Sequence, residues 1–309
     1  MAIFTYEVLA RDKEFKRHYT YRIMKMLCFA NLLQSIPFLA GGVMTIAQSS
    51  FNDVLDRALG AIVGSGWYLY ICTSVTLAVD RLLLFVFPRL TYSSMIRTAF
   101  VAFSFLVWLV TLVAMCLPEF GNTYRHDGMY YCWGYTVGSV STIVESVEPY
   151  CDMSVFFITF CMYLIVCGYL IKLKRSSTDQ STSLKAEFRI LIVAVCAFLY
   201  ETVFVVWSFW VPLYLLGLEF MYIFLTLTWM VECGIFASLT LAMNATLRKK
   251  VLRIWGAKQK TKVASINAQS VFQSAVNKQK MMNSFTVSRV MCHASYVPCN
   301  LVTSRNFHM

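Results

Sequence analysis

The sequence predicts an all-α protein, built as a polytopic bundle of transmembrane helices. Its 309 residues are 58% hydrophobic and only 14% charged, which is too apolar for a domain with one aqueous core. Apolar runs long enough to cross about 30 Å of hydrocarbon recur along the chain. They lack the alternation of a membrane barrel, so we expect helices in a lipid bilayer.

Six spanning helices are predicted in order along the chain, at 19–47, 59–87, 98–117, 153–171, 190–216 and 220–243. The segments that connect them alternate in charge. Those before the first span and after the second, fourth and sixth spans are basic, whereas the others carry few basic residues and several acids. By the positive-inside rule, the basic segments and both termini are cytoplasmic.

Four regions follow from this pattern. Residues 1–18 form a cytoplasmic N-terminal stub and loop, and residues 19–246 form the bundle. Residues 247–256 are expected to form an amphipathic helix on the membrane surface, where Leu247, Val251 and Leu252 can face lipid while Lys249 and Arg253 face water. Residues 257–309 are basic and lack apolar periodicity, so a disordered cytoplasmic tail is expected.

The net charge of +11 does not indicate a nucleic-acid partner, because much of the excess lies between the spans and in the tail. The four His lie in loops and tail, and the 11 Cys form no cluster at metal spacing. Neither an enzyme, a metal site nor a cofactor is predicted.

The stretch "TLAVDRLLLFVFPRL" carries Asp80 and Arg81 near the cytoplasmic end of the second span, with Pro88 eight positions after the acid. An arginine at a helix end can simply anchor the helix at the lipid headgroups. Together with Pro88, however, the pair resembles the Asp-Arg-Tyr motif of rhodopsin-like G-protein-coupled receptors, in which it closes the third of seven helices.

Three further stretches, "YTYRIMKMLCFANLL", "GSGWYLYICTSVTLAVDR" and "MNATLRKKV", resemble the nematode serpentine chemoreceptors, most closely class T. Matched to that family, the six spans are helices two to seven. The first helix is missing, which indicates either a truncated or mis-started gene product or a six-span protein with its N-terminus inside. The Asn-Pro-x-x-Tyr and Cys-Trp-x-Pro motifs are absent, and Asn31 stands where the family carries a sodium-site aspartate.

The resemblance implies a chemosensory receptor that binds an odorant-like small molecule and signals to a heterotrimeric G protein. It would reside in the plasma membrane of sensory neuron cilia. The residues implied in switching and G-protein coupling are Asp80, Arg81, Pro88, Asn244 and Arg248. Two alternatives stay open, namely a truncated non-signalling receptor fragment and a small multi-span transporter or channel.

Glu201 and Glu232 fall near the midpoints of their spans, where an ionisable group is expensive and suggests function. No basic residue stands at matching depth. A structural hydrogen bond between helices and a ligand or switching role are both open for them. Aromatic residues in the same region suit either an interfacial belt or a pocket for a small apolar or cationic odorant. These ligand-binding candidates are Trp67, Tyr70, Tyr200, Trp207 and Trp229.

The long segment 118–152 is predicted to lie outside the cell and carries Cys132 and Cys151. An oxidising compartment allows a bridge between these two residues, and two free cysteines are equally compatible with the sequence.

Overall fold

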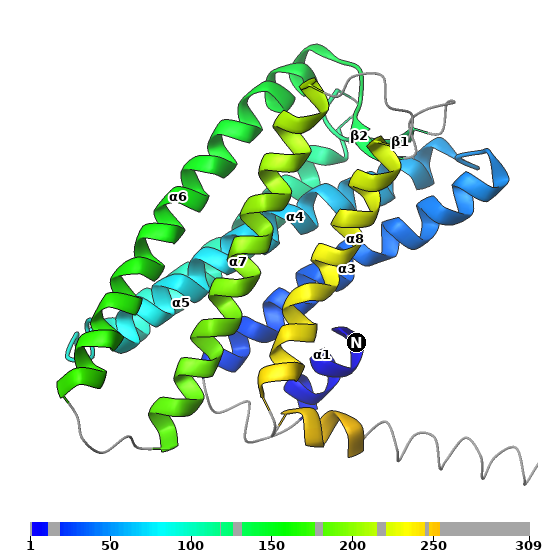
Figure 1. The fold of residues 1–309 in the computed structure, drawn as a ribbon. Helices are drawn as coiled ribbons and strands as arrows, with labels where there is room; N and C mark the ends of the chain where they lie inside the picture. The colour runs from blue at the N-terminus through cyan, green and yellow to red at the C-terminus, as the bar shows by residue number, and fades with distance from the viewer. Residues whose placement is uncertain are drawn as a thin grey trace, which may run out of the picture. The chain divides into compact units, whose positions relative to one another are not determined.

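A computed structural model describes residues 2–11, 19–117, 119–125, 132–176, 182–214, 221–244 and 247–253 (Figure 1). The chain divides into two compact units, Met1–Val251 and Leu252–Met309, and the fold described below is that of the first unit. The predicted tail, 257–309, lies outside the described residues, as do residues 12–18 of the predicted N-terminal region and 254–256 of the predicted surface helix.

Within the described residues, six long helices form the bundle, and each contains a segment long and apolar enough to cross a membrane. They confirm the predicted all-α fold with six spans. Their bounds are α3 (Tyr19–Ala47), α4 (Asp53–Phe85), α5 (Ser93–Met115), α6 (Ser139–Ser176), α7 (Thr182–Tyr214) and α8 (Met221–Met243).

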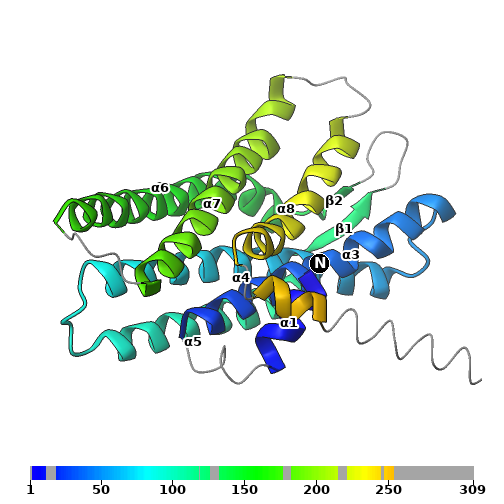
Figure 2. The same cartoon turned by 60° about the horizontal axis from the view of Figure 1, so that its bottom comes forward.

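Helix α4 is the central element of the bundle (Figures 1 and 2). It packs against α3 and α5 along much of its length and also contacts α6 and α7, while α8 packs against α3 and α7. Most of the apolar window of α4 is buried, whereas that of α5 is mostly exposed. A side chain on α4 therefore has protein on most sides, which suits polar groups that lipid cannot hydrogen-bond.

The N-terminal region that the sequence predicts as a stub and loop begins with a helix, α1 (Ala2–Arg11). It packs beside α3 and α8. Thr5, Val8 and Leu9 are buried in that contact. Ten residues of α-helix are about 15 Å long, too short to cross the hydrocarbon by themselves.

Several helices extend beyond the apolar runs from which they were predicted. Helix α4 begins at Asp53, because the Asn52 side chain caps it by accepting the Val54 N–H at 2.7 Å. Helix α6 begins at Ser139, well before the predicted start of the span at 153, and continues to Ser176. We call the end of the bundle that holds the start of α3 and the end of α4 the inner end, and the opposite end the outer end.

A β-hairpin, which the sequence did not predict, covers part of the outer end. Strands β1 (Asn122–Arg125) and β2 (Cys132–Tyr135) pair antiparallel, with Asn122 opposite Tyr135. The Tyr124 N–H donates to the buried Asp56 carboxylate of α4 at 2.9 Å. The Tyr124 and Trp133 rings lie 5.2 Å apart, and both belong to a buried apolar cluster with Phe38 of α3.

The end of strand β2 is joined to α6. The Tyr135 hydroxyl donates to the Glu148 carboxylate at 2.8 Å. Burial raises the pKa of the Tyr135 phenol, and the neighbouring Glu148 carboxylate adds to the effect. The phenol is therefore the proton donor in this contact, which fixes the hairpin to α6 as well as to α4.

Residues 247–253 are helical, as predicted, but their apolar face is placed differently from the prediction. Leu247 and Val251 lie one turn apart and are buried, so they pack against protein and not against lipid, whereas Leu252, the third residue predicted to face lipid, is exposed.

Candidate functional site

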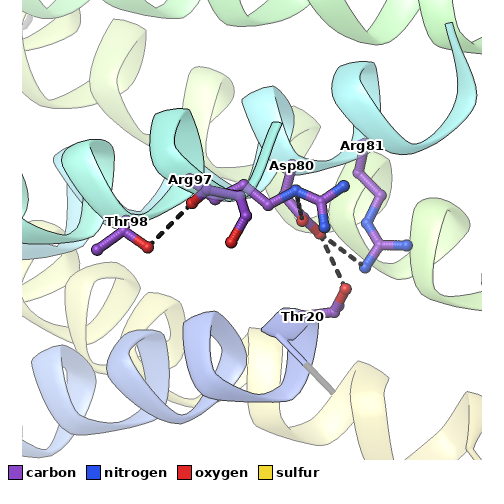
Figure 3. Close-up of polar contacts among 6 residues, drawn as sticks. Thr20, Asp80, Arg81, Arg97 and Thr98 are labelled. Atoms are coloured by element: carbon purple, nitrogen blue, oxygen red, sulfur yellow. Dashed lines mark hydrogen bonds and ion pairs between the residues drawn. The ribbon is translucent and has the colours of Figure 1, made fainter. Parts of the chain in front are cut away.

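An inner charge cluster, formed by Thr20, Asp80, Arg81 and Arg97, lies at the inner end of the bundle (Figure 3). The Asp80 carboxylate accepts the Thr20 hydroxyl of α3 at 2.9 Å. It lies 3.4 Å from the Arg81 guanidinium and 3.2 Å from Nε of Arg97 on α5. One carboxylate thus joins three helices.

The burial of Asp80 and Arg81 shows that they do not form a membrane-edge anchor. Asp80 is 1% exposed and Arg81 is fully buried, whereas an anchoring arginine would extend its guanidinium to the headgroups. Buried charges are retained only when they are paired. The cluster therefore holds Arg81 inside the protein by means of Asp80.

Arg97 was not singled out from the sequence, where it counted only as one of the basic residues after the second span. In the structure its guanidinium lies 5.9 Å from the centre of the Tyr19 ring, as a cation–π contact. It is also partly exposed, unlike Arg81. Asp80 consequently has two arginines as partners, one enclosed and one at the edge of the solvent.

The other predicted switch residues lie near the inner end but outside this cluster. Pro88 is exposed in the turn after α4. Asn244 follows α8, and its side-chain oxygen accepts the Leu247 N–H at 3.0 Å. That bond makes Asn244 the N-cap of the helix at 247–253. Arg248 donates to the Ala242 carbonyl at 3.0 Å from an exposed position.

An aromatic layer, formed by Trp67, Phe204 and Trp229, crosses the middle of the bundle. Ring centres are 6.0 Å apart for Trp67 and Phe204, and 5.9 Å apart for Trp229 with each of the other two. These residues come from α4, α7 and α8. The structure thus brings together two predicted ligand-binding candidates, Trp67 and Trp229, and adds Phe204.

Polar groups that the sequence did not single out hold the indole rings in place. The Trp67 indole N–H donates to the Asp152 carboxylate of α6 at 3.1 Å. The Trp229 indole N–H donates to the Gln34 side-chain oxygen of α3 at 2.9 Å. An apolar stretch of sequence carries no signal for such contacts, because they depend on how the helices are rotated.

Beside the aromatic layer lie Tyr70, Glu201 and Glu232. Glu201 is 1% exposed and Glu232 is fully buried. Both acids are close enough to Tyr70, and to each other, to interact electrostatically. Tyr70 also stacks on Trp67, with ring centres 6.1 Å apart.

The two remaining ligand-binding candidates contact α8 at other points. The Tyr200 hydroxyl donates to the Thr228 carbonyl at 3.1 Å, and the Trp207 ring lies 5.3 Å from the Phe224 ring. Both therefore link α7 to α8.

Cys132 lies on β2 and Cys151 on α6. Cys151 is exposed and carries a free thiol, so this structure does not join the two residues. The bridge stays a prediction.

The six spans and their packing define a class of protein. The fold resembles the crystal structure of squid rhodopsin with a TM-score of 0.62, at 13% sequence identity, over 82% of this chain and 80% of that one. The likeness identifies a rhodopsin-like helix bundle. Within that class, the chain belongs to the serpentine seven-transmembrane G-protein-coupled chemoreceptor family Srt, which it matches over residues 1–264.

This membership makes the chain a multi-pass membrane protein of a receptor family and not an enzyme, and it removes the transporter or channel alternative. A comparison with curated proteins found no match.

Proposed function

We propose that this receptor binds an odorant-like small molecule in the middle of the bundle and signals to a heterotrimeric G protein at the inner end. The observation that carries the proposal is the inner charge cluster. There a buried arginine is held by one carboxylate whose other partners come from two neighbouring helices.

The two sites lie on one helix, since α4 carries both Tyr70 and Asp80. Ten residues of α-helix separate them, which is about 15 Å along the axis. A ligand that favours a shifted or rotated α4 would alter the contacts of Asp80 with α3 and α5, because helix shifts are a common form of switching. Arg81 would then become available to the G protein.

Asp80 is the resting-state partner of Arg81 in this proposal, and Thr20 and Arg97 keep that carboxylate in place. Pro88 shapes the turn that presents the end of α4, while Asn244 and Arg248 order the helix after α8. Basic residues between 172 and 189 are proposed to add docking surface, and Lys172 and Arg189 are exposed there.

The proposed location is the plasma membrane of sensory neuron cilia, with the C-terminus in the cytoplasm. The basic segments at the inner end support this orientation.

The Arg81→Ala variant tests the proposal. Cells that express the receptor and a G-protein activation sensor would be exposed to a panel of odorant-like small molecules. We expect Arg81→Ala to abolish the response while surface expression is maintained, because Ala removes the group that would contact the G protein.

Arg89→Ala is the matched control, because Arg89 is an exposed arginine in the turn after the same helix. It should leave most of the response intact. Full coupling by Arg81→Ala at normal surface expression would contradict the proposed switch, and a wild-type receptor that is silent to the whole panel would favour the non-signalling alternative.

A further inference from the structure

We propose that the ligand of this receptor is a small organic cation, held through its ammonium group between the Glu201 and Glu232 carboxylates and the aromatic layer. The inference rests on the proposed function, since it names the chemical class of the ligand that the middle of the bundle binds.

The helices carry their aromatic and polar residues in matching register. Trp67 and Tyr70, Phe204 and Glu201, and Trp229 and Glu232 are each three residues apart, about one helical turn. Helices α4 and α8 run from the outer end to the inner end, whereas α7 runs the opposite way. In all three helices the aromatic residue is therefore the outer member of its pair.

A second layer lies one helical turn closer to the inner end than the aromatic layer. We call it the polar layer, and it contains Tyr70, Glu201 and Glu232. Asn31 belongs to it by the same reasoning, because Gln34 bonds to Trp229 and Asn31 precedes Gln34 by three residues on α3, which runs toward the outer end. Four helices thus place polar side chains at one depth.

Three members of the polar layer, Asn31, Glu201 and Glu232, have side-chain atoms without a hydrogen-bond partner. Both amide atoms of Asn31 and all four carboxylate oxygens of Glu201 and Glu232 are buried without a hydrogen bond. The Tyr70 hydroxyl and the Cys233 thiol interact with the Glu232 carboxyl group, and Ser74 interacts with that of Glu201. These contacts do not give any of the four carboxylate oxygens a well-formed hydrogen bond. A buried polar group without a partner is costly.

Protonation alone does not remove this cost, because a carboxylic acid adds an O–H group that needs an acceptor of its own. The nearby Asp152 adds a third carboxyl group that interacts with Glu201. Among the described residues, no Lys, Arg or His forms an ion pair with any of these three acids. The group that would satisfy them is an external donor with a positive charge.

The aromatic layer can bind the same cation through cation–π contacts. One turn of helix separates the two layers, and a cation binds an aromatic face within about 6 Å of the ring centre. An ammonium group between the layers can therefore donate to the carboxylates and contact Trp67 or Trp229 at the same time. The three rings already contact one another, which leaves little space between them. A small ammonium head group is therefore favoured.

A bare metal ion is the competing occupant. The described residues contain no group of three or more His, Cys, Asp or Glu side chains arranged to hold one. Aromatic faces also offer a metal ion no ligand atoms, whereas they suit an alkylammonium group.

The experiment uses purified full-length receptor in nanodiscs. Thermal unfolding is followed with two probes, 2-phenylethylammonium and benzylammonium, and with their neutral counterparts, 2-phenylethanol and benzyl alcohol. Sodium chloride at the same ionic strength serves as the metal-ion comparison. We expect the ammonium probes to raise the melting temperature in a saturable way, since a ligand that binds the folded state stabilises it.

Glu201→Gln and Glu232→Gln keep the side-chain shape and remove the charge. Each should weaken the apparent affinity for the ammonium probes about tenfold or more, as expected for a lost charge-assisted hydrogen bond. Glu145→Gln is the matched control, because Glu145 is an exposed acid on α6, and it should leave the affinity unchanged. Trp229→Phe provides a second test on the aromatic side, with weaker binding of benzylammonium expected.

Three results would overturn the inference: equal stabilisation by the alcohols, stabilisation by sodium chloride alone, or unchanged ammonium affinity in both Gln variants. A G-protein activation assay on the same receptor separates this inference from the proposed function. Ammonium binding without activation would contradict signalling only, whereas activation by neutral compounds that do not need Glu201 or Glu232 would contradict the ligand class only.

Discussion

At the scale of single residues, Asp80 controls the charge balance of the inner end. Two arginines face this one carboxylate, so the inner charge cluster carries an excess positive charge in a largely buried place. Such an arrangement is stable only while the acid is present, because removal of one member leaves uncompensated charge. Asp80 also does not depend on Arg81 alone, since Arg97 and Thr20 can still bind its carboxylate when Arg81 moves away.

We predict that Asp80→Ala destabilises the receptor by about 3–5 kcal/mol, the range found when one partner of a buried ion pair is removed. Thermal unfolding in detergent would measure the change. Asp53→Ala is the control, because Asp53 is an exposed acid in the first turn of the same helix, and its effect should be much smaller. Equal effects of the two substitutions would show that Asp80 does not hold the cluster together.

At the scale of elements, the hairpin and α4 fit together by close backbone approach. The Asp56 carboxylate fixes the Tyr124 N–H, and Gly60 lets the strand reach the helix. A Cβ atom at Gly60 would lie 1.7 Å from the Asn122 carbonyl oxygen. No side chain fits there, so the strand sits on the helix backbone itself.

The Gly60→Ala variant should therefore displace the hairpin and destabilise the receptor by about 1–3 kcal/mol, as overpacking does. Gly42→Ala is the matched control within α3, because an added Cβ meets nothing within 4 Å at that position. It should be neutral or stabilise the helix by about 0.5–1 kcal/mol. Hydrogen exchange at the hairpin amides and thermal unfolding would measure both, and equal behaviour of the two variants would argue against tight docking.

The elements also show what the sequence could and could not predict. Apolar length locates the six spans because the bilayer sets it. The same rule misplaces the start of α6, since a helix can continue into polar sequence outside the lipid. The strands of the hairpin, "NTYR" and "CWGY", are too short for a period-two pattern, and their pairing depends on contacts with α4.

The sequence predicted only part of the candidate site. Asp80, Arg81, Glu201 and Glu232 stand out in sequence because a charge among apolar residues is conspicuous. Partners such as Arg97, Thr20 and Gln34 are ordinary residues until the helices are packed side by side, and no local pattern marks them.

At the scale of the whole first unit, polarity falls from the centre of the bundle to its periphery. Asp80, Glu201 and Glu232 are all buried between helices. Helix α5 is the opposite case. In its middle, Ser104 is buried and bonded to Thr76 at 3.1 Å, and Trp108 packs on Phe29 of α3, while Phe103, Leu106 and Val110 are exposed. We infer that this exposed face of α5 contacts lipid.

A lysine scan of α5 tests that inference, because the cost of a charge in a bilayer depends on depth. Leu106 is 59% exposed near the middle of the helix, and Met95 is 72% exposed in its first turn. Leu106→Lys should cost about 2.5–3.5 kcal/mol and reduce the membrane-inserted, surface-expressed fraction strongly. Met95→Lys should have little effect, since its ammonium group reaches the headgroups. If the two variants reached the cell surface equally well, the Leu106 face would border water or another protein, and α5 would not be the lipid-facing wall of the bundle.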